Sequence, residues 1–242
     1  NITTEGLEFG LLQLGVKVQI GDCLLEVTQI GKECHQHCQI YQQVGMCIMP
    51  TEGVFTRVLA GGQIRAGDVI TIIPRFRAAI ITMSDKAFAG QRADASGPAI
   101  AKVLQDRVQV THQIVLSDDQ EGLESTLRKL CDKSEADVIF TTGGTGFSPR
   151  DHTPEATLAV SERLVPGITE AMRAASLKIT PRAMLSRATA GIRGKTLIIN
   201  LPGSPKAAVE CLEVFLPVMA HALETLVGET VECAPPSEQI AQ

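Results

Sequence analysis

From about residue 75 onward, short apolar runs alternate with stretches of helical periodicity. Strands are expected at Ala78–Met83, Val108–Leu116, Asp137–Phe140 and Leu197–Leu201, and Ala78–Met83 is apolar without interruption. Continuous apolar runs of this length are typical of parallel strands that are buried on both faces. Leu123, Leu127 and Leu130 recur at the spacing of one helical face. The alternation predicts a doubly wound, mostly parallel α/β sheet with right-handed crossovers.

The preceding region, residues 1 to about 73, has a different pattern. Val16–Ile20 and Cys23–Ile30 read as strands around a Gly21-Asp22 turn, and Gly53–Leu59 and Asp68–Ile73 read as two further strands. This pattern predicts a small β-barrel or sandwich without a convincing helix. Pro74 ends it, since proline cannot continue a ladder of hydrogen bonds. We therefore predict domains at 1–74 and 75–233 and a tail at 234–242.

Composition excludes two classes of partner. The 242 residues carry a formal net charge of −5, with 22 basic and 27 acidic residues, seven Phe, one Tyr and no Trp. Neither a basic stripe nor a set of stacking aromatics is present, so we expect no binding to nucleic acid. No apolar run approaches the roughly 20 residues of a membrane-spanning helix, and no signal peptide is apparent. We expect a cytoplasmic protein whose true beginning is missing, because the chain starts at Asn1 without a Met.

The loop after Asp137–Phe140 contains the most specific motif of the sequence. Thr141, Thr142, Gly143, Gly144, Thr145 and Gly146 follow the strand directly. Ligands of open α/β sheets bind at the carboxyl ends of the strands, and glycines let backbone N–H groups approach phosphate oxygens. A tight structural turn is the alternative interpretation. Farther along, Thr153 with Pro154 and Glu155 predicts a helix whose N-cap is the Thr153 hydroxyl.

Acidic residues follow two of the predicted strands. Asp151 lies in the glycine loop, and Asp118-Asp119 follow the strand that ends at Leu116. A carboxylate beside a phosphate site is repelled unless a divalent cation lies between them, so the pattern favours Mg²⁺ held by Asp118 and Asp151. Taken alone, an Asp-Asp pair before a helix is more often a cap.

Two more loops should reach the same edge of the sheet. Ser84-Asp85-Lys86 follows the first strand, and Pro202-Gly203-Ser204 follows the late one and starts a helix. Gly203 and Ser204 are candidates to offer N–H groups to an anion, with an ordinary proline-punctuated turn as the alternative.

Cysteines gather in the first region. Cys34-His-Gln-His-Cys38 together with Cys47 resembles half of a zinc site, but the second ligand pair is missing. A single functional thiol is a competing interpretation, and inert packing is the default. Seven cysteines is an odd number, which fits a disulfide framework poorly.

The second region resembles the MogA/MoaB family of molybdopterin adenylyltransferases. The resemblance spans about residues 76–233 and is carried by Met83–Lys86, Thr141–Thr157, Leu185–Arg187 and Leu201–Lys206. It implies a three-layer α/β fold, commonly trimeric, which joins ATP and molybdopterin in molybdenum cofactor synthesis and releases pyrophosphate. Where the family usually has Pro-Asp, this chain has Ser117-Asp118.

The resemblance also implies roles for individual residues. Asp118 and Asp151 correspond to the essential acidic residues of the family, here taken as catalytic and as Mg²⁺ ligands. Ser186 corresponds to a pterin contact. The substrate-binding set that the resemblance and the loop positions predict is Ser84, Thr141, Thr142, Gly143, Gly144, Thr145, Gly146, Ser186, Pro202, Gly203 and Ser204.

The first region resembles the carboxyl-terminal part of a MOSC domain, the module named after molybdenum cofactor sulfurases. The segments that carry this likeness are Asn1–Gly6, Gly15–Gly21, Ile30–His35 and Gly61–Asp68. In that family the first segment lies well inside the domain, so the barrel here is expected to be incomplete. Cys34 falls on the characteristic cysteine of the family, which is thought to handle sulfur or the cofactor.

Two alternatives to adenylyl transfer stay open at this point. One is a non-catalytic carrier of molybdopterin or molybdenum cofactor, with sulfur handling by the MOSC-like region. The other is molybdate insertion, which ranks lower because the proteins that perform it carry additional large domains. An adenylyltransferase would have ATP and molybdopterin as its partners and would hand its product to a molybdate-inserting enzyme.

Overall fold

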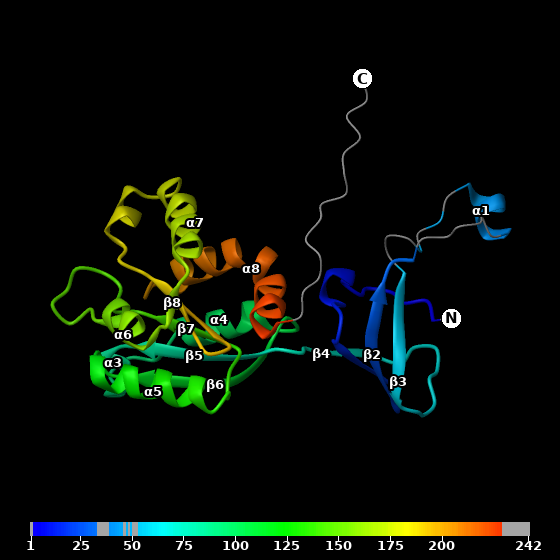
Figure 1. Cartoon of the computed structure of the whole chain (residues 1–242), viewed down its shortest axis with the longest axis horizontal. Helices are drawn as coiled ribbons and strands as arrows, with labels where there is room; N and C mark the ends of the chain where they lie inside the picture. The colour runs from blue at the N-terminus through cyan, green and yellow to red at the C-terminus, as the bar shows by residue number, and fades with distance from the viewer. Residues whose placement is uncertain (1, 33–38, 46, 48, 50–52, 229–242) are drawn as a thin grey trace, which may run out of the picture. The chain divides into compact units, whose positions relative to one another are not determined.

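The structure is a computed structural model that describes residues 2–32, 39–45, 47, 49 and 53–228. The chain folds into two compact units (Figure 1). The first comprises Asn1–Arg75 with Leu104–Gln109, and the second comprises Phe76–Val103 with Val110–Gln242. The main segment of the first unit thus ends next to the predicted boundary at residue 74. The predicted tail, 234–242, lies outside the described residues.

The first unit contains one antiparallel sheet with the strand order β3-β2-β1-β4. Its strands are β1 (Lys17–Ile20), β2 (Cys23–Ile30), β3 (Val54–Ala60) and β4 (Ile70–Ile73). Alternate residues of the first two strands point into a small core, as their period-two pattern predicts. The buried set is Leu12, Val16, Val18, Ile20, Cys23, Leu25 and Val27.

The turn between β1 and β2 depends on a glycine. Ile20 and Cys23 are paired, which leaves only Gly21 and Asp22 to connect the strands. Gly21 has φ +51°, and a Cβ there would lie 2.6 Å from the carbonyl oxygen of Gln63. The positive φ and the close backbone approach both favour glycine at this position.

Two expectations for the first unit do not hold in the predicted form. A 3₁₀ helix η1 (Phe9–Leu11) and a helix α1 (Gln39–Val44) are present, so the prediction that this region lacks helices is wrong. The barrel is not confirmed either. Among the described strands, β3 and β4 form the two edges of the sheet and do not pair with each other.

The second unit is built around a six-stranded sheet with the order β6-β5-β7-β10-β9-β8. Its strands are β5 (Arg77–Met83), β6 (Gln109–Leu116), β7 (Val138–Thr142), β8 (Arg163–Leu164), β9 (Ala190–Arg193) and β10 (Thr196–Leu201). Its helices are α3 (Asp85–Phe88), α4 (Ser96–Leu104), α5 (Gln120–Asp132), α6 (Thr153–Val160), α7 (Pro166–Leu177), the 3₁₀ helix η2 (Pro181–Leu185) and α8 (Pro205–Val227).

The core of this sheet is parallel, as predicted. β7 pairs in parallel with β5 on one side and with β10 on the other. β6 runs in the same direction, because Thr111 bonds to Ala78 near the strand starts and Ser84 bonds to Leu116 at the strand ends. β9 is antiparallel to β10, and β8 is antiparallel to β9. The sheet is therefore mixed and mostly parallel, with an antiparallel edge that the sequence pattern did not indicate.

Helices cover both faces of the sheet, which gives three layers (Figure 1). α5 and α6 pack on the face that carries Ile81, Ile139 and Ile198. On the other face, the ring of Phe140 meets that of Phe215 in α8 edge-on, with centroids 6.5 Å apart. Both faces are apolar because helices cover both.

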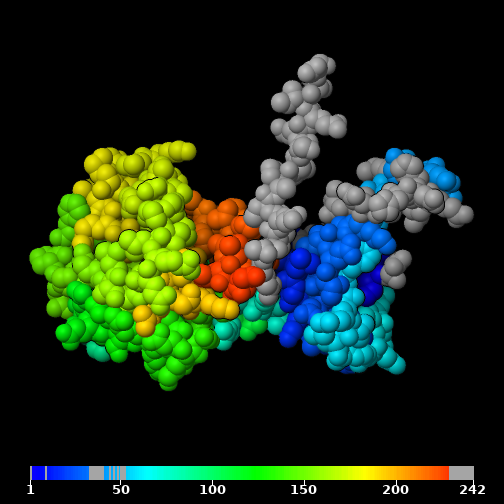
Figure 2. All heavy atoms as spheres, viewed as in Figure 1, coloured from blue at the N-terminus to red at the C-terminus, as the bar shows by residue number. Residues whose placement is uncertain are grey.

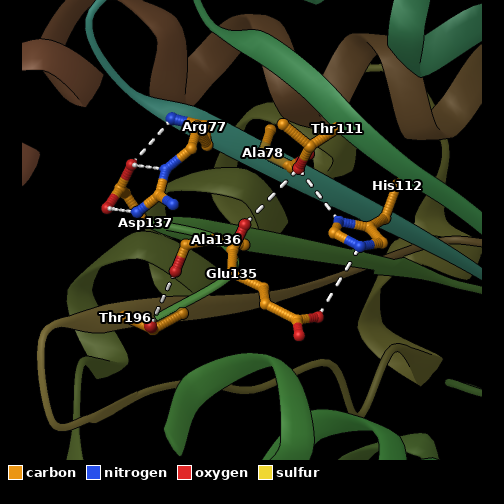
Figure 3. A network of polar contacts seen from close by, with 8 residues as sticks. All are labelled: Arg77, Ala78, Thr111, His112, Glu135, Ala136, Asp137 and Thr196. Carbon is orange, nitrogen blue, oxygen red and sulfur yellow. Dashed lines mark hydrogen bonds and ion pairs between the residues drawn. The ribbon is translucent and has the colours of Figure 1, made fainter. Parts of the chain in front are cut away.

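Polar contacts tie the strands together at their amino ends (Figure 3). Arg77 binds both carboxylate oxygens of Asp137 from the start of the neighbouring strand, at 3.1 and 3.2 Å. Thr196 donates to the carbonyl oxygen of Ala136 at 2.8 Å. His112 lies 3.6 Å from Glu135. These contacts join neighbouring strands at the edge opposite to the glycine loop and the acidic loops.

Among the described residues, no helix has both the length and the apolar character that crossing a membrane requires.

Candidate functional site

The glycine loop after β7 is closely fitted into the protein. Gly143 has φ +95°, and a Cβ there would lie 2.4 Å from the carbonyl oxygen of Met83. Gly144 has φ +63°, and its Cβ would lie 2.4 Å from Oγ1 of Thr153. Both positions are closed to other residues. The glycines thus serve a tight structural turn as well as any ligand.

The start of α6 differs from the predicted cap. Thr153 is the first residue of the helix, and His152, at the N-cap position, makes no capping bond with its side chain. The Thr153 hydroxyl donates instead to the carbonyl oxygen of Gly143 at 2.8 Å. The predicted Thr153 cap is therefore wrong, because the hydroxyl holds the glycine loop against the helix.

The two threonines at the end of β7 are fully buried. The side-chain amide of Asn200 donates to Oγ1 of Thr141 and of Thr157, at 2.9 and 2.8 Å. The Thr142 hydroxyl donates to the carbonyl oxygen of Pro202 at 2.6 Å. These hydroxyls are engaged inside the protein, so they position the loop and join it to β10 and α6.

The two predicted anion loops lie side by side. A Cβ on Gly203 would come within 3.1 Å of the Cα of Gly143, so the loops after β7 and β10 are in backbone contact. Ser96, at the start of α4, donates to the carbonyl oxygen of Gly203 at 2.9 Å. Ser204 is the N-cap residue of α8, and its side chain makes no capping bond.

Three loops of the carboxyl edge converge on one charged cluster, formed by Asp85, Asp118 and Arg150. The N–H of Asp85 donates to Oδ2 of Asp118, and the N–H of Asp118 donates to Oδ1 of Asp85, at 3.1 and 3.0 Å. Arg150 contacts both carboxylate oxygens of Asp85 at 2.8 Å. Arg150 also donates to the carbonyl oxygen of Asp118 at 3.2 Å. This arrangement fixes the position of Asp118.

The surroundings shift the two carboxyl groups of this cluster in opposite directions. The N–H of Asp118 and the Arg150 guanidinium lower the pKa of Asp85. Burial raises the pKa of Asp118, and the negative charges of Asp85 and Asp151 raise it further against the N–H of Asp85 and the Arg150 charge. The negative charge of Asp151 thus acts on Asp118 in the same direction as that of Asp85.

The adjacent residues Asp118 and Asp119 make different contacts. Asp119 is the N-cap of α5, and its side chain accepts the N–H of Gly122 at 2.7 Å. Asp118 faces Asp85 instead. Ser84 is likewise the N-cap of α3, accepting the N–H of Ala87, and its hydroxyl also receives a bond from Arg92 at 3.2 Å. The cap interpretation is thus confirmed for Asp119, and Asp118 stays a predicted site residue.

The carboxylates of Asp151 and Asp118 each accept a backbone N–H through one oxygen. Oδ2 of Asp151 accepts the N–H of Ser148 at 3.0 Å, as Oδ2 of Asp118 accepts that of Asp85. In the part of the chain that the structure describes, no hydrogen bond reaches the other oxygen of either carboxylate. No set of three or more His, Cys, Asp or Glu side chains among these residues could hold a metal ion. The protein itself therefore offers a cation at most two such ligands here.

A pocket of about 290 Å³ opens beside the glycine loop. Four of the predicted residues line it: Thr145, Gly146, Ser186 and Pro202. Its remaining wall comes from α7, η2 and the start of α8, with apolar Met172, Ile179 and Ala183. Mostly apolar walls with a few polar groups are usual for sites that bind a ring system. Of the predicted site residues, these four line the pocket, and Asp118 belongs to the charged cluster.

Three residues that the structure places at the site were not predicted as members of it. Asp85 and Arg150 belong to the charged cluster, and Arg187 donates to the carbonyl oxygen of Gly146 at 2.7 Å. Asp85 directly follows the predicted residue Ser84, and Arg150 directly precedes the predicted residue Asp151. This adjacency in the sequence could have identified both as candidate site residues. Cys34 lies outside the described residues.

Comparison with known proteins identifies the class to which this fold and site belong. The family model described as "Probable molybdopterin binding domain" matches residues 79–221. The chain belongs to this family, and its relatives are proteins of molybdenum cofactor biosynthesis.

Individual relatives sharpen this assignment. The chain is 42% identical over 156 residues to the molybdopterin adenylyltransferase of Helicobacter pylori strain J99, covering 63% of this chain and 89% of that protein. It is 37% identical over 175 residues to the molybdopterin adenylyltransferase of Escherichia coli K12, covering 66% and 89%. Among solved structures, MoaB of Thermus thermophilus matches with a TM-score of 0.61 and 48% identity, covering 64% of this chain and 98% of that one.

Proposed function

We propose that this chain is a molybdopterin adenylyltransferase that uses Mg²⁺ and ATP. The observation that carries the proposal is the position of the glycine loop. It contributes Thr145 and Gly146 to the wall of a pocket of about 290 Å³. It also leads to Asp151 and, through the contact of Arg150, to Asp118, in a chain about 40% identical to enzymes of that name. A carrier of molybdopterin would need the pocket alone. The negative charges of Asp118 and Asp151 fit a second substrate that is itself charged and brings a cation, as ATP with Mg²⁺ does.

In the proposed reaction, an oxygen of the molybdopterin phosphate attacks the α-phosphorus of ATP. The bond between that phosphorus and the bridging oxygen of the β-phosphate breaks, and pyrophosphate leaves with the electron pair. A phosphate monoester is already anionic at neutral pH, so the step depends on positioning and charge neutralisation. The pocket with Ser186 would orient the pterin, and backbone N–H groups of the Gly143–Gly146 and Gly203-Ser204 loops would hold phosphate oxygens.

The residues present fit a magnesium ion. Mg²⁺ usually takes one or two protein carboxylates and completes its shell with phosphates and water. Asp118 and Asp151 each have one oxygen free of hydrogen bonds within the described residues, and their mutual repulsion would be relieved by a cation. When bound, the ion would neutralise charge on the triphosphate. Asp85 and Arg150 would keep Asp118 in place.

The first prediction concerns Asp151. Asp151→Asn should lower the turnover of ATP with molybdopterin by about 100-fold or more, since a ligand that stabilises developing charge is lost. The amide can still accept the N–H of Ser148, so the melting temperature should stay near that of the wild type. Pyrophosphate release and formation of adenylyl-molybdopterin by the purified full chain measure the effect.

Asp132→Asn is the matched control. Asp132 is an exposed carboxylate on α5 that is bound by Arg193 away from the loops. This variant should keep normal turnover. If wild-type protein binds molybdopterin but releases no pyrophosphate with Mg²⁺ and ATP, the chain is a carrier and the proposed activity is wrong.

We also propose that the chain assembles as a trimer, as the family resemblance implies. The support is the exposure of large apolar side chains in β8, α7 and η2; the segment from α7 to η2, yellow in Figure 2, forms part of the surface of the second unit. These side chains are Leu164, Leu177 and Met184. Apolar surface of this kind on a folded domain marks contact with another protein.

A further inference from the structure

Arg187 connects the wall of the pocket to the loop that carries Asp151. It follows Ser186, which lines the pocket, and lies just after the end of η2. Its backbone N–H donates to the carbonyl oxygen of Thr145, another pocket residue, at 3.0 Å. The segment with Ser186 is therefore attached directly to the glycine loop.

The side chain of Arg187 holds both ends of the segment from Gly146 to Asp151. Nε donates to the carbonyl oxygen of Gly146 at 2.7 Å, and Nη2 donates to the carbonyl oxygen of Asp151. Nη1 pairs with Oε1 of Glu155, in the first turn of α6. One planar group thus binds two carbonyl oxygens of the loop and one carboxylate through three separate nitrogens, a spread of donors that the single nitrogen of a lysine does not reproduce.

Between these two ends, another contact with the rest of the second unit is made by the side chain of Arg150, which binds Asp85 and the carbonyl oxygen of Asp118. Phe147 is 68% exposed, and Arg150 also lies on the surface. Within the segment, Ser148 and Asp151 bond to each other through an N–H to carboxylate bond and an N–H to carbonyl bond, at 3.0 and 2.9 Å. The position of the Asp151 carboxylate therefore depends on where the backbone of the segment is held, and Arg187 holds it.

We propose that Arg187 is a positioning residue for adenylyl transfer, setting the Asp151 carboxylate at a fixed place relative to the pocket. The inference rests on the proposed function for its catalytic meaning. In geometric terms, the proposal is that the pocket and the carboxylates of Asp118 and Asp151 form one site, joined through the Arg187 side chain. Glu155 orients the guanidinium from the side opposite to the loop.

The direct test is Arg187→Lys in the full chain. Lysine keeps the charge beside Glu155 but loses the simultaneous bonds to both carbonyl oxygens. Turnover should fall about 10- to 100-fold, because small misplacement of a reacting or charge-stabilising group has costs of that order. The KM for molybdopterin should stay within about twofold, because Ser186 and the apolar wall of the pocket remain.

Arg193→Lys is the matched control. Arg193 also forms a fork, to both oxygens of Asp132 and to the carbonyl oxygen of Val160, but away from the site. It should lose stability to a similar degree and keep wild-type turnover. Equal loss of turnover in the two lysine variants would mean that Arg187 has only a structural role.

A second measurement does not depend on catalysis. Hydrogen exchange at the amides of Ser148 and Asp151 should be about 10-fold faster in Arg187→Lys and unchanged in Arg193→Lys, since local opening becomes easier where the fork is lost. If the wild-type chain has no adenylyltransferase activity, the proposed function fails while the exchange data still test the positioning. Unchanged exchange at both amides would overturn the inference.

A double variant tests whether Arg187 acts through Asp151. In an Asp151→Asn background, Arg187→Lys should reduce the remaining turnover by less than about threefold, because the carboxylate that it positions is already gone. A full additive loss would contradict the inference. If Arg187→Lys does not fold, Glu155→Gln replaces it, with a smaller loss of turnover and faster exchange expected; wild-type values for both would overturn the inference.

Discussion

Gly143 shows how strictly one residue can be fixed by its surroundings. Its φ of +95° lies in the left-handed region, and an added Cβ would lie 2.4 Å from a backbone oxygen, that of Met83. The atom in the way is main chain of a central strand, so it cannot move aside as a flexible side chain could. The position is closed both by conformation and by space.

Gly143→Ala should therefore lower the free energy of unfolding by about 2 kcal/mol or more, combining backbone strain with the clash. Urea denaturation of the full chain measures the change. Gly167→Ala is the control, because Gly167 lies in the first turn of α7 with open space at its Cβ. That substitution should be neutral or stabilising by up to about 1 kcal/mol. Equal effects at both positions would contradict the assignment of Gly143 as a closed position.

Residues next to the predicted site residues also make contacts that shape the candidate site. Position in the sequence indicated that Asp118 and Asp119 both follow a strand, but only the structure separates them, with Asp119 capping α5 and Asp118 facing Asp85. Asp85 and Arg150 are 65 positions apart. No local pattern relates residues at such a separation, because their contact arises when two loops meet at one sheet edge.

At the scale of elements, one amide joins a strand, a helix and a loop. The Asn200 side chain donates to Thr141 in β7 and to Thr157 in α6. Its Oδ1 accepts the N–H of Thr189 at 3.1 Å. All polar atoms of the side chain are thus engaged in the core, where an unsatisfied polar group is costly.

Asn200→Ala should destabilise the protein by about 2–4 kcal/mol, because it leaves two buried hydroxyls and an N–H without their partner. Thermal and urea unfolding measure the loss. Thr126→Ala serves as a control. It removes only a half-buried hydroxyl that bonds to the Gly122 carbonyl within its own helix, and should cost less than about 1 kcal/mol. A loss of similar size in both variants would show that the amide has no special role.

Elements with a strong periodic signal were predicted closely, and others were not. The helix indicated by Leu123, Leu127 and Leu130 is observed as α5, with these three side chains buried. The strands β8 and β9 were not predicted. They have two and four residues, and the first is exposed throughout. Segments this short carry no detectable alternation, and pairing with neighbours from elsewhere in the chain decides that they are strands.

At the scale of the whole molecule, 64% of the chain accounts for 98% of the Thermus MoaB structure. The second unit therefore corresponds to a whole protein elsewhere. The first unit is an additional antiparallel sheet whose likeness to a MOSC domain stays a prediction, as does the role of Cys34. The family match covers residues 79–221, within the second unit.

Assembly is the prediction at this scale. Light scattering of the full chain should give a mass about three times its 25.8 kDa. Met184→Glu should shift that mass toward the monomer, since it places a charge among exposed apolar side chains of η2. Val69→Glu, at an exposed apolar residue of the first unit, should leave the mass unchanged. A monomeric wild type would refute the trimer.

The sequence by itself determined the parallel core and the edge at which the glycine loop and the acidic loops lie. The mostly apolar strands at Ala78–Met83, Asp137–Phe140 and Leu197–Leu201 indicate a sheet covered on both faces, and the loops after parallel strands must share the carboxyl edge. The tertiary structure alone decided how the residues at that edge are connected: which aspartate of the pair faces the site, that Arg150 binds Asp85, and that Arg187 joins the pocket to Asp151. Burial patterns are local and can be read along the chain. Contacts between side chains of separate loops exist only once the sheet has brought those loops together.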